Sequence, residues 1–89
     1  MLIKKIEIVN KLGLHARASS KLVELANSFK SNILIEKDIK QANAKSIMTV
    51  MMLAANKGSF ITLKVDGADE EIAMAKLTDL IANKFGESE

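Results

Sequence analysis

Residues 10–29 read NKLGLHARASSKLVELANSF, and within this stretch the spacing of apolar residues changes from that of a strand to that of a helix. The residues just before it, Leu2–Val9, are rich in β-branched side chains that alternate with polar ones, which predicts a half-buried strand. The alternating strand pattern ends in the turn that contains Gly13, because glycine readily adopts backbone angles that other residues avoid. From Ala16 to Phe29 the apolar residues recur at helical spacing, as Leu22, Leu25, Ala26 and Phe29. We therefore predict a strand, a turn and an amphipathic helix that begins near His15.

The rest of the chain predicts three further strands and two further helices. The strands are expected at Asn32–Lys37, Gln41–Ala44 and Phe60–Asp66. One helix is expected from an N-cap at Ser46 to about Ala54, and the other from about Asp69 to Phe85 with an apolar stripe of Ala73, Leu77, Leu80 and Ile81. Asp69, Glu70 and Glu71 are expected to complement the dipole of that last helix.

The order β-α-β-β-α-β-α predicts an α+β fold in a single domain spanning residues 1–89. We expect a four-stranded, mainly antiparallel sheet with three helices on one face, which together bury one core. A chain of 89 residues can fold alone, but it is too small to enclose a deep cavity as well. Chemistry at an open surface is therefore expected.

Composition excludes several classes of function. The chain has no cysteine and one histidine, which argues against disulfides and against thiolate or zinc sites, so we expect neither a metal nor a cofactor. The N-terminal residues resemble neither a signal peptide nor a membrane span, and we expect a cytoplasmic protein that does not bind membranes. A net charge of +2 is too small to indicate a nucleic-acid partner, although it suits an acidic protein surface.

His15 is the residue best suited to carry chemistry. The free amide groups at a helix N-terminus attract anions, and Arg17 can add a charge-assisted hydrogen bond to a phosphate oxygen. Both features also disfavour a positive charge on the imidazole, so they favour the neutral, nucleophilic form. These residues describe a coherent phosphoryl-acceptor site, but the same pattern also fits a surface histidine beside a solvated arginine.

The segment Leu12-Gly13-Leu14-His15-Ala16-Arg17 closely resembles the active-site motif of HPr, the histidine-containing phosphocarrier family of the bacterial phosphotransferase system. The segment from Asn43 to Met48 is similar to the family's regulatory-serine motif, and the similarity extends over essentially the whole chain. The resemblance implies an open-faced β-sandwich in which His15 is phosphorylated on Nδ1 by phospho-enzyme I. The group then passes to a histidine of an enzyme IIA component while Arg17 screens its charge. The resemblance implies a carrier that uses no metal and is not a turnover enzyme by itself. Because such a carrier is a mobile intermediate with an exposed site, we expect a small monomer.

Two residues in these motifs raise separate questions. Ala18 stands where the family commonly has proline, and it retains an N–H group that proline lacks. Ser46 is expected to cap a helix, and the resemblance adds phosphorylation by the HPr kinase/phosphorylase as a second role.

Apolar residues crowd the short helix that is expected after Ser46. Met51 or Met52, together with Val50, is expected to fill the core. The other apolar residues of this helix are expected to form an exposed, adaptable surface that suits several partners. The matching family helix docks onto enzyme I and enzyme IIA. We expect the docking surface to consist of Ala16, Ser20, Lys21, Ile47, Met48 and Met51.

Three other interpretations are open at this stage. A small RNA- or DNA-binding domain would need exposed aromatic residues and a basic stripe, whereas this chain has three phenylalanines and no tyrosine or tryptophan. An adaptor that has lost transfer activity is a second interpretation. A carrier that serves a regulatory rather than a sugar-transporting branch is the third.

Overall fold

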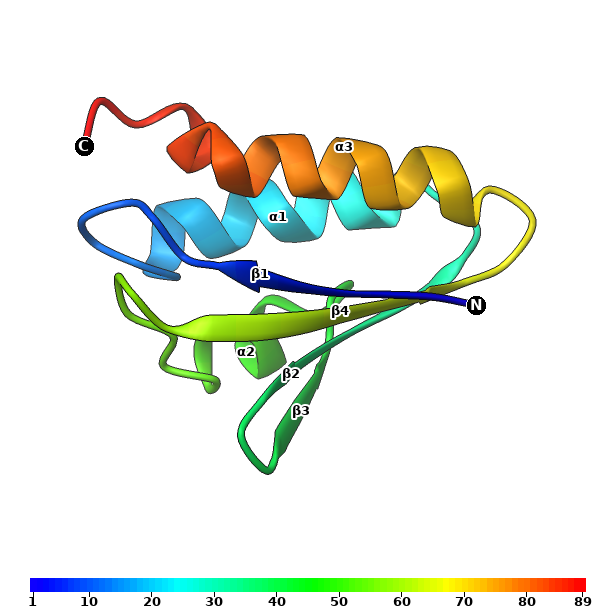
Figure 1. Cartoon of the computed structure of the whole chain (residues 1–89), viewed down its shortest axis with the longest axis horizontal. Coiled ribbons are helices and arrows are strands. Elements are labelled where there is room, and N and C mark those ends of the chain that lie inside the picture. Colours follow the sequence, from blue (N-terminus) through cyan, green and yellow to red (C-terminus); the bar gives the residue numbers. More distant parts are fainter.

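The computed structural model describes residues 1–89. Its elements follow the predicted order, with a short 3₁₀ turn added near the end (Figure 1). The strands are β1 (Leu2–Glu7), β2 (Asn32–Lys37), β3 (Lys40–Asn43) and β4 (Phe60–Asp66). The helices are α1 (Ala16–Asn27), α2 (Ile47–Met51) and α3 (Glu70–Ala82), and the 3₁₀ turn η1 spans Lys84–Gly86.

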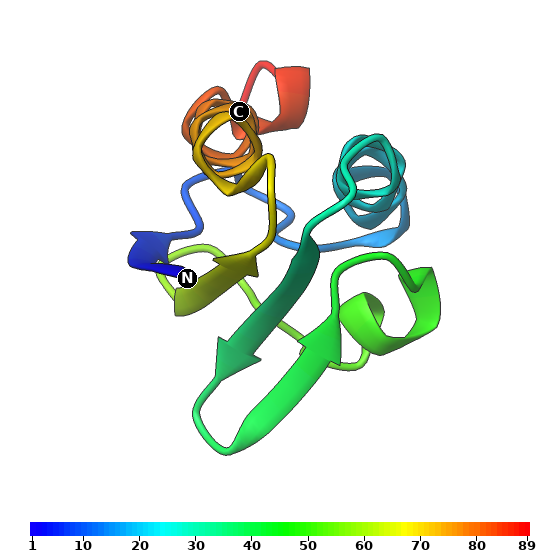
Figure 2. The same ribbon diagram turned by 90° about the vertical axis from the view of Figure 1, so that its right-hand side faces the viewer.

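The four strands form one sheet in the order β1-β4-β2-β3, and every neighbouring pair is antiparallel. The predicted α+β fold with a four-stranded antiparallel sheet is thus confirmed. Figures 1 and 2 show α1 and α3 side by side above the sheet, with α2 beside β3. The core is a cluster of 20 buried residues between sheet and helices.

The alternation of the central strands explains how the sheet buries one face. In β4, Ile61, Leu63 and Val65 are buried, while the residues between them are partly exposed. Val65 lies opposite Ile33 of β2, and Leu63 lies opposite Ile35. Because side chains on a strand alternate between faces, this register puts all of these apolar groups against the helices.

The predicted apolar stripes of the two long helices are confirmed. On α1, Leu22 and Ala26 are buried, and Leu25 packs partly buried against the core. On α3 the predicted residues Ala73, Leu77 and Ile81 are buried, and Leu80 is partly buried. The longest helix has 13 residues, and none is long and apolar enough to cross a bilayer.

Helix α2 is shorter and more exposed than the sequence predicts. It ends at Met51, after which the chain tightens through hydrogen bonds from the Leu53 and Ala54 N–H groups to the Val50 and Met51 carbonyls and reaches a left-handed conformation at Ala54 (φ 53°). Val50 is buried as predicted, but the expectation that Met51 or Met52 fills the core is wrong, since these side chains are 40% and 70% exposed. Ser46 occupies the N-cap position, yet its side chain makes no cap hydrogen bond.

Asp69 also differs from its expected role, because its carboxylate is directed at a loop. It accepts hydrogen bonds from the backbone N–H groups of Lys30 and Ser31 at 2.8 and 2.9 Å, and from the Ser31 hydroxyl. The Ser31 hydroxyl, followed by the Lys30 N–H, lowers the pKa of Asp69. Asp69 therefore ties the α1–β2 loop to the start of α3 rather than only complementing the helix dipole.

The segment after α3 turns back over the molecule. Helix α3 ends before the predicted Phe85, because Lys84 and Phe85 both adopt positive φ angles of 58° and 56°. This turn buries the Phe85 ring in the core, and the Lys21 ammonium donates a hydrogen bond to the Phe85 carbonyl at 2.7 Å. In Figure 1 the chain beyond this point ends near the β1–α1 loop.

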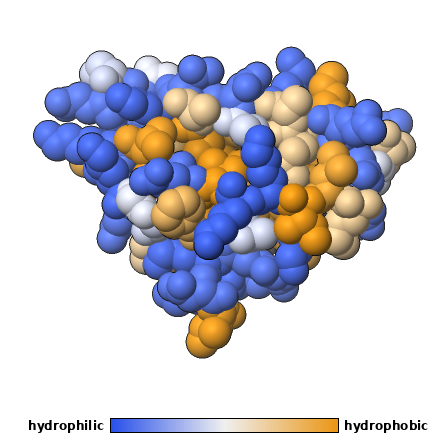
Figure 3. All heavy atoms as spheres, in the orientation of Figure 1, coloured by the Kyte–Doolittle hydropathy of each residue, from blue (hydrophilic) through white to orange (hydrophobic).

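Most of the surface that faces the viewer in Figure 3 is hydrophilic. An apolar tip projects at its lower end, where the β2–β3 turn lies and where Ile39 is fully exposed.

Candidate functional site

The β1–α1 loop that presents His15 is fixed by backbone hydrogen bonds. Gly13 adopts a left-handed conformation (φ 64°), and the side-chain amide of Asn10 donates a hydrogen bond to its carbonyl at 2.9 Å. The next residue, Leu14, is buried, and its N–H donates to the Ala55 carbonyl at 2.8 Å. The Ser19 hydroxyl donates to the Leu14 carbonyl at 3.0 Å. His15 is therefore held at a defined position although it lies in a loop.

Replacing Gly13 with alanine is expected to lower the free energy of unfolding by about 2 kcal/mol or more. A Cβ at this position would collide with the Ala55 carbonyl oxygen, and the left-handed backbone would be strained as well. Gly58→Ala is the matched control, because Gly58 also has a positive φ but has open space around it. It is expected to cost about 1 kcal/mol. Thermal or urea unfolding measures both, and equal losses for the two variants would contradict the close approach at Gly13.

His15 is the N-cap residue of α1. Its backbone is extended (φ −75°, ψ −179°) and its side chain makes no cap hydrogen bond, so the imidazole is free for other contacts. The Ser19 N–H donates to the His15 carbonyl at 2.8 Å, whereas the N–H groups of Ala16, Arg17 and Ala18 have no acceptor. Free amides at the start of a helix form a partly positive region that attracts anions. The predicted placement of His15 at the helix N-terminus is confirmed.

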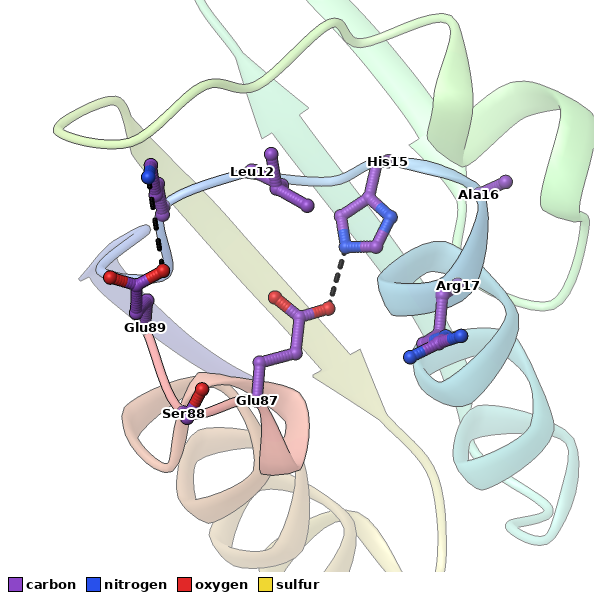
Figure 4. Close-up of a pocket in the computed structure, with 8 residues that line it drawn as sticks. Leu12, His15, Ala16, Arg17, Glu87, Ser88 and Glu89 are labelled. Carbon is purple, nitrogen blue, oxygen red and sulfur yellow. Dashed lines mark hydrogen bonds and ion pairs between the residues drawn. The ribbon is translucent and has the colours of Figure 1, made fainter.

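Glu87 lies against His15 and was not among the predicted site residues. Its Oε2 is 2.6 Å from His15 Nε2, and its Oε1 accepts a hydrogen bond from the Asn10 side chain at 3.0 Å (Figure 4). The Asn10 hydrogen bond lowers the pKa of Glu87, and the hydrogen bond and charge of His15 lower it further. Glu87 is therefore an ionised acceptor at neutral pH, and Nε2 of His15 must carry the proton that it accepts.

The other ring nitrogen of His15 is directed away from Glu87. Figure 4 shows Nδ1 pointing toward the start of α1, from whose first turn Arg17 projects. Since a neutral imidazole has one N–H and one lone pair, a proton on Nε2 leaves the lone pair on Nδ1. The geometry thus leaves Nδ1 as the ring nitrogen that makes no contact with Glu87.

His15, Arg17 and Glu87 line one open surface pocket. The remaining lining residues are Lys11, Leu12, Ala16, Ser88 and Glu89. Arg17 forms no ion pair in the structure, so its guanidinium is available to an anion in this pocket. No cluster of three or more histidine, cysteine, aspartate or glutamate side chains lies where it could hold a metal ion.

The residues predicted for docking lie on the exposed faces of two neighbouring helices, α1 and α2. They are Ala16, Ser20, Lys21, Ile47, Met48 and Met51, all of which are exposed. Among the three apolar docking residues on α2, Met48 is the most exposed at 68%. Lys21 differs from the others because its ammonium is engaged by the Phe85 carbonyl. Ser46, at the start of α2, is partly exposed and its hydroxyl makes no hydrogen bond.

Sequence reasoning missed Glu87 and Asn10 because neither belongs to a local motif. Glu87 is 72 positions away from His15 in the chain. The only signal was the acidic character of residues 87–89, which suits a basic site but does not say where these residues lie.

Comparison with known proteins shows to which family the chain is similar. The family model described as "PTS HPr component phosphorylation site" matches residues 2–83. The phosphocarrier protein HPr of Neisseria meningitidis serogroup A is 57% identical over 89 residues, which cover the whole of both chains. A solved structure of HPr from Thermoanaerobacter tengcongensis is 48% identical, with a TM-score of 0.96 and full coverage of both chains. A structure described as an HPr dimer from the same organism is 51% identical, with a TM-score of 0.79, and covers 92% of this chain and 94% of that one.

Proposed function

Because the chain belongs to the HPr family of phosphocarrier proteins, we propose that His15 accepts a phosphoryl group from phospho-enzyme I and donates it to a histidine of an enzyme IIA component. The family places the chain in the phosphotransferase system as a carrier rather than a turnover enzyme. The assignment of the acceptor atom, the partners and a monomeric working state are the proposal.

The observation that carries this proposal is the environment of His15 Nδ1. This nitrogen faces the start of α1, where three backbone N–H groups have no acceptor and where Arg17 has no ion-pair partner. A phosphoryl group on Nδ1 would bring oxygens that need such donors. The site lies on the surface, with the His15 side chain 28% exposed, so that another protein can reach it.

This arrangement accounts for both half-reactions, the uptake of the phosphoryl group by His15 and its donation to enzyme IIA. The lone pair of His15 Nδ1 attacks the phosphorus carried by phospho-enzyme I, a P–N bond to His15 forms, and the bond from phosphorus to the enzyme I donor atom breaks, with its electron pair left on the donor. The free amides and Arg17 stabilise the charge on the three oxygens of the transferring group. In the second half-reaction the enzyme IIA histidine attacks the same phosphorus, and His15 leaves as the neutral imidazole.

The proposal is tested by incubating the chain with enzyme I, Mg²⁺ and phosphoenolpyruvate. We expect one added phosphate per chain, labile to acid and stable to base as an N-linked phosphohistidine is, and its transfer to an added enzyme IIA protein. If the chain takes up no label, the proposed function is wrong.

We also propose that Ser46 is a regulatory phosphorylation site. A phosphate on Ser46 would place negative charge at the start of α2, beside Ile47 and Met48 of the expected docking surface. We propose that this surface meets an acidic face of enzyme I, where like charges across the interface would weaken the complex. Ser46→Asp is expected to slow phosphoryl uptake about tenfold, whereas Ser46→Ala is expected to match the wild type, since the side chain makes no cap hydrogen bond.

The measurement is the initial rate of uptake at limiting enzyme I. Equal rates for Ser46→Asp and Ser46→Ala would contradict the regulatory role. Incubation with ATP and a competent HPr kinase should in addition give an acid-stable phosphate on the wild type and none on Ser46→Ala.

A further inference from the structure

Glu87 belongs to a segment that is fastened to the molecule at several points. The Phe85 ring is buried in the core, and the Lys21 ammonium holds the Phe85 carbonyl at 2.7 Å. Farther along, the backbone N–H of Lys11 donates to the Glu89 main-chain oxygen at 2.7 Å. Glu87 lies between these two attachments, with its side chain only 15% exposed. Its position is therefore determined by the fold rather than by a chance contact of an exposed side chain.

The carboxylate of Glu87 joins the loop before His15 to the imidazole itself. One oxygen accepts from the Asn10 amide at 3.0 Å and the other lies 2.6 Å from His15 Nε2. The same Asn10 amide also donates to the Gly13 carbonyl at 2.9 Å, so the loop and the carboxylate share a donor. This arrangement restricts rotation of the imidazole about its bond to Cβ, because a rotated ring would lose its acceptor.

We propose that Glu87 is a positioning residue for phosphoryl transfer, which holds the proton of His15 on Nε2 and directs the Nδ1 lone pair toward the phosphoryl donor. This inference rests on the proposed function of His15. It adds a residue from the segment after η1 to a site that otherwise consists of the His15 loop and the first turn of α1.

Charge changes during transfer give Glu87 a second effect. When Nδ1 forms its bond to phosphorus while Nε2 keeps its proton, the ring acquires positive charge. A carboxylate 2.6 Å from Nε2 stabilises that charge, as the aspartate of a Ser-His-Asp triad stabilises an imidazolium. The proton stays on Nε2 throughout, and the bond to phosphorus forms on the opposite side of the ring. Glu87 therefore assists transfer without occupying the phosphoryl position.

The variant that tests this inference is Glu87→Gln, which keeps the size of the side chain and removes its charge. Glu71→Gln is the matched control: it removes an equal charge from an exposed side chain in the first turn of α3, outside the pocket around His15, where Glu71 forms no ion pair. We expect uptake of phosphoryl groups by Glu87→Gln to be slower by about tenfold. In metal sites, removing the carboxylate that orients a histidine ligand lowers metal affinity or activity by about 10- to 100-fold, and tenfold is the lower end of that range. Glu71→Gln is expected to stay within about twofold of the wild type.

A second measurement separates positioning from a general loss of structure. In ¹⁵N-detected NMR of neutral His15, we expect the wild type and Glu71→Gln to carry the ring proton on Nε2 with slowed solvent exchange. Glu87→Gln should show faster exchange of that proton while its backbone spectrum and melting temperature stay close to those of the wild type.

Equal uptake rates for Glu87→Gln and the wild type would overturn the inference, and so would a wild-type proton on Nδ1. Either result would leave His15 as the acceptor. Failure of the wild type to take up any phosphate would instead refute the proposed function, so the two failures are distinguishable.

Discussion

The His15→Ala chain is expected to take up no phosphoryl group from phospho-enzyme I, under conditions in which the wild type takes up one. The chain contains a single histidine, so no second imidazole can replace it. Alanine cannot form a bond to phosphorus, and the loss should therefore be complete rather than partial. The measurement is incorporation of acid-labile phosphate, followed by mass spectrometry of the intact chain.

This variant should also keep its fold, which makes the comparison clean. His15 makes no cap hydrogen bond, and its backbone role in accepting from the Ser19 N–H does not depend on the side chain. The Glu87 carboxylate loses one partner and retains Asn10. A folded His15→Ala chain that still carried acid-labile phosphate would contradict the central assignment.

Arg17→Ala is expected to lower the rate of phosphoryl uptake by about 100-fold, the effect of removing one charged donor from a developing anion. Arg17 is exposed and forms no ion pair, so its loss should leave the melting temperature nearly unchanged. Arg17→Lys should recover part of the rate, because lysine restores the charge but not the forked donor geometry. Stopped-flow or quench-flow uptake at fixed enzyme I concentration measures these rates.

Lys30→Ala provides the control for Arg17→Ala, since it removes an exposed positive charge just beyond the opposite end of α1. If both variants slowed uptake equally, the effect would come from net charge and long-range attraction rather than from contact with the phosphoryl group. Uptake by Arg17→Ala at the wild-type rate would remove Arg17 from the site.

Local sequence patterns were sufficient where a single element decides the outcome. Strands β2 and β4 have the predicted bounds, because alternating apolar residues are flanked there by polar residues and turns. The helix start at His15 could likewise be read from the glycine before it and the apolar spacing after it. The order of these elements was enough to predict the class of fold and its antiparallel sheet.

Prediction failed where tertiary contacts override a local preference. Apolar spacing continues past Met51, yet α2 ends there because the chain must bring Ala55 to the Gly13 loop. At the end of α3, Phe85 could continue the helical stripe, but its burial in the core requires a left-handed turn instead. That turn sends Glu87 to His15, and no periodicity in the sequence encodes a contact over 72 positions.

The hydrogen bond from the Leu14 N–H to the Ala55 carbonyl affects how a docked protein would be placed relative to His15. It joins the segment that follows α2 to the loop that precedes His15, and so restrains the position of one relative to the other. In the proposed function, a partner that binds the exposed face of α2 would thereby be held at a restrained distance from the imidazole. We expect its reactive histidine to have a high effective concentration at His15 for this reason.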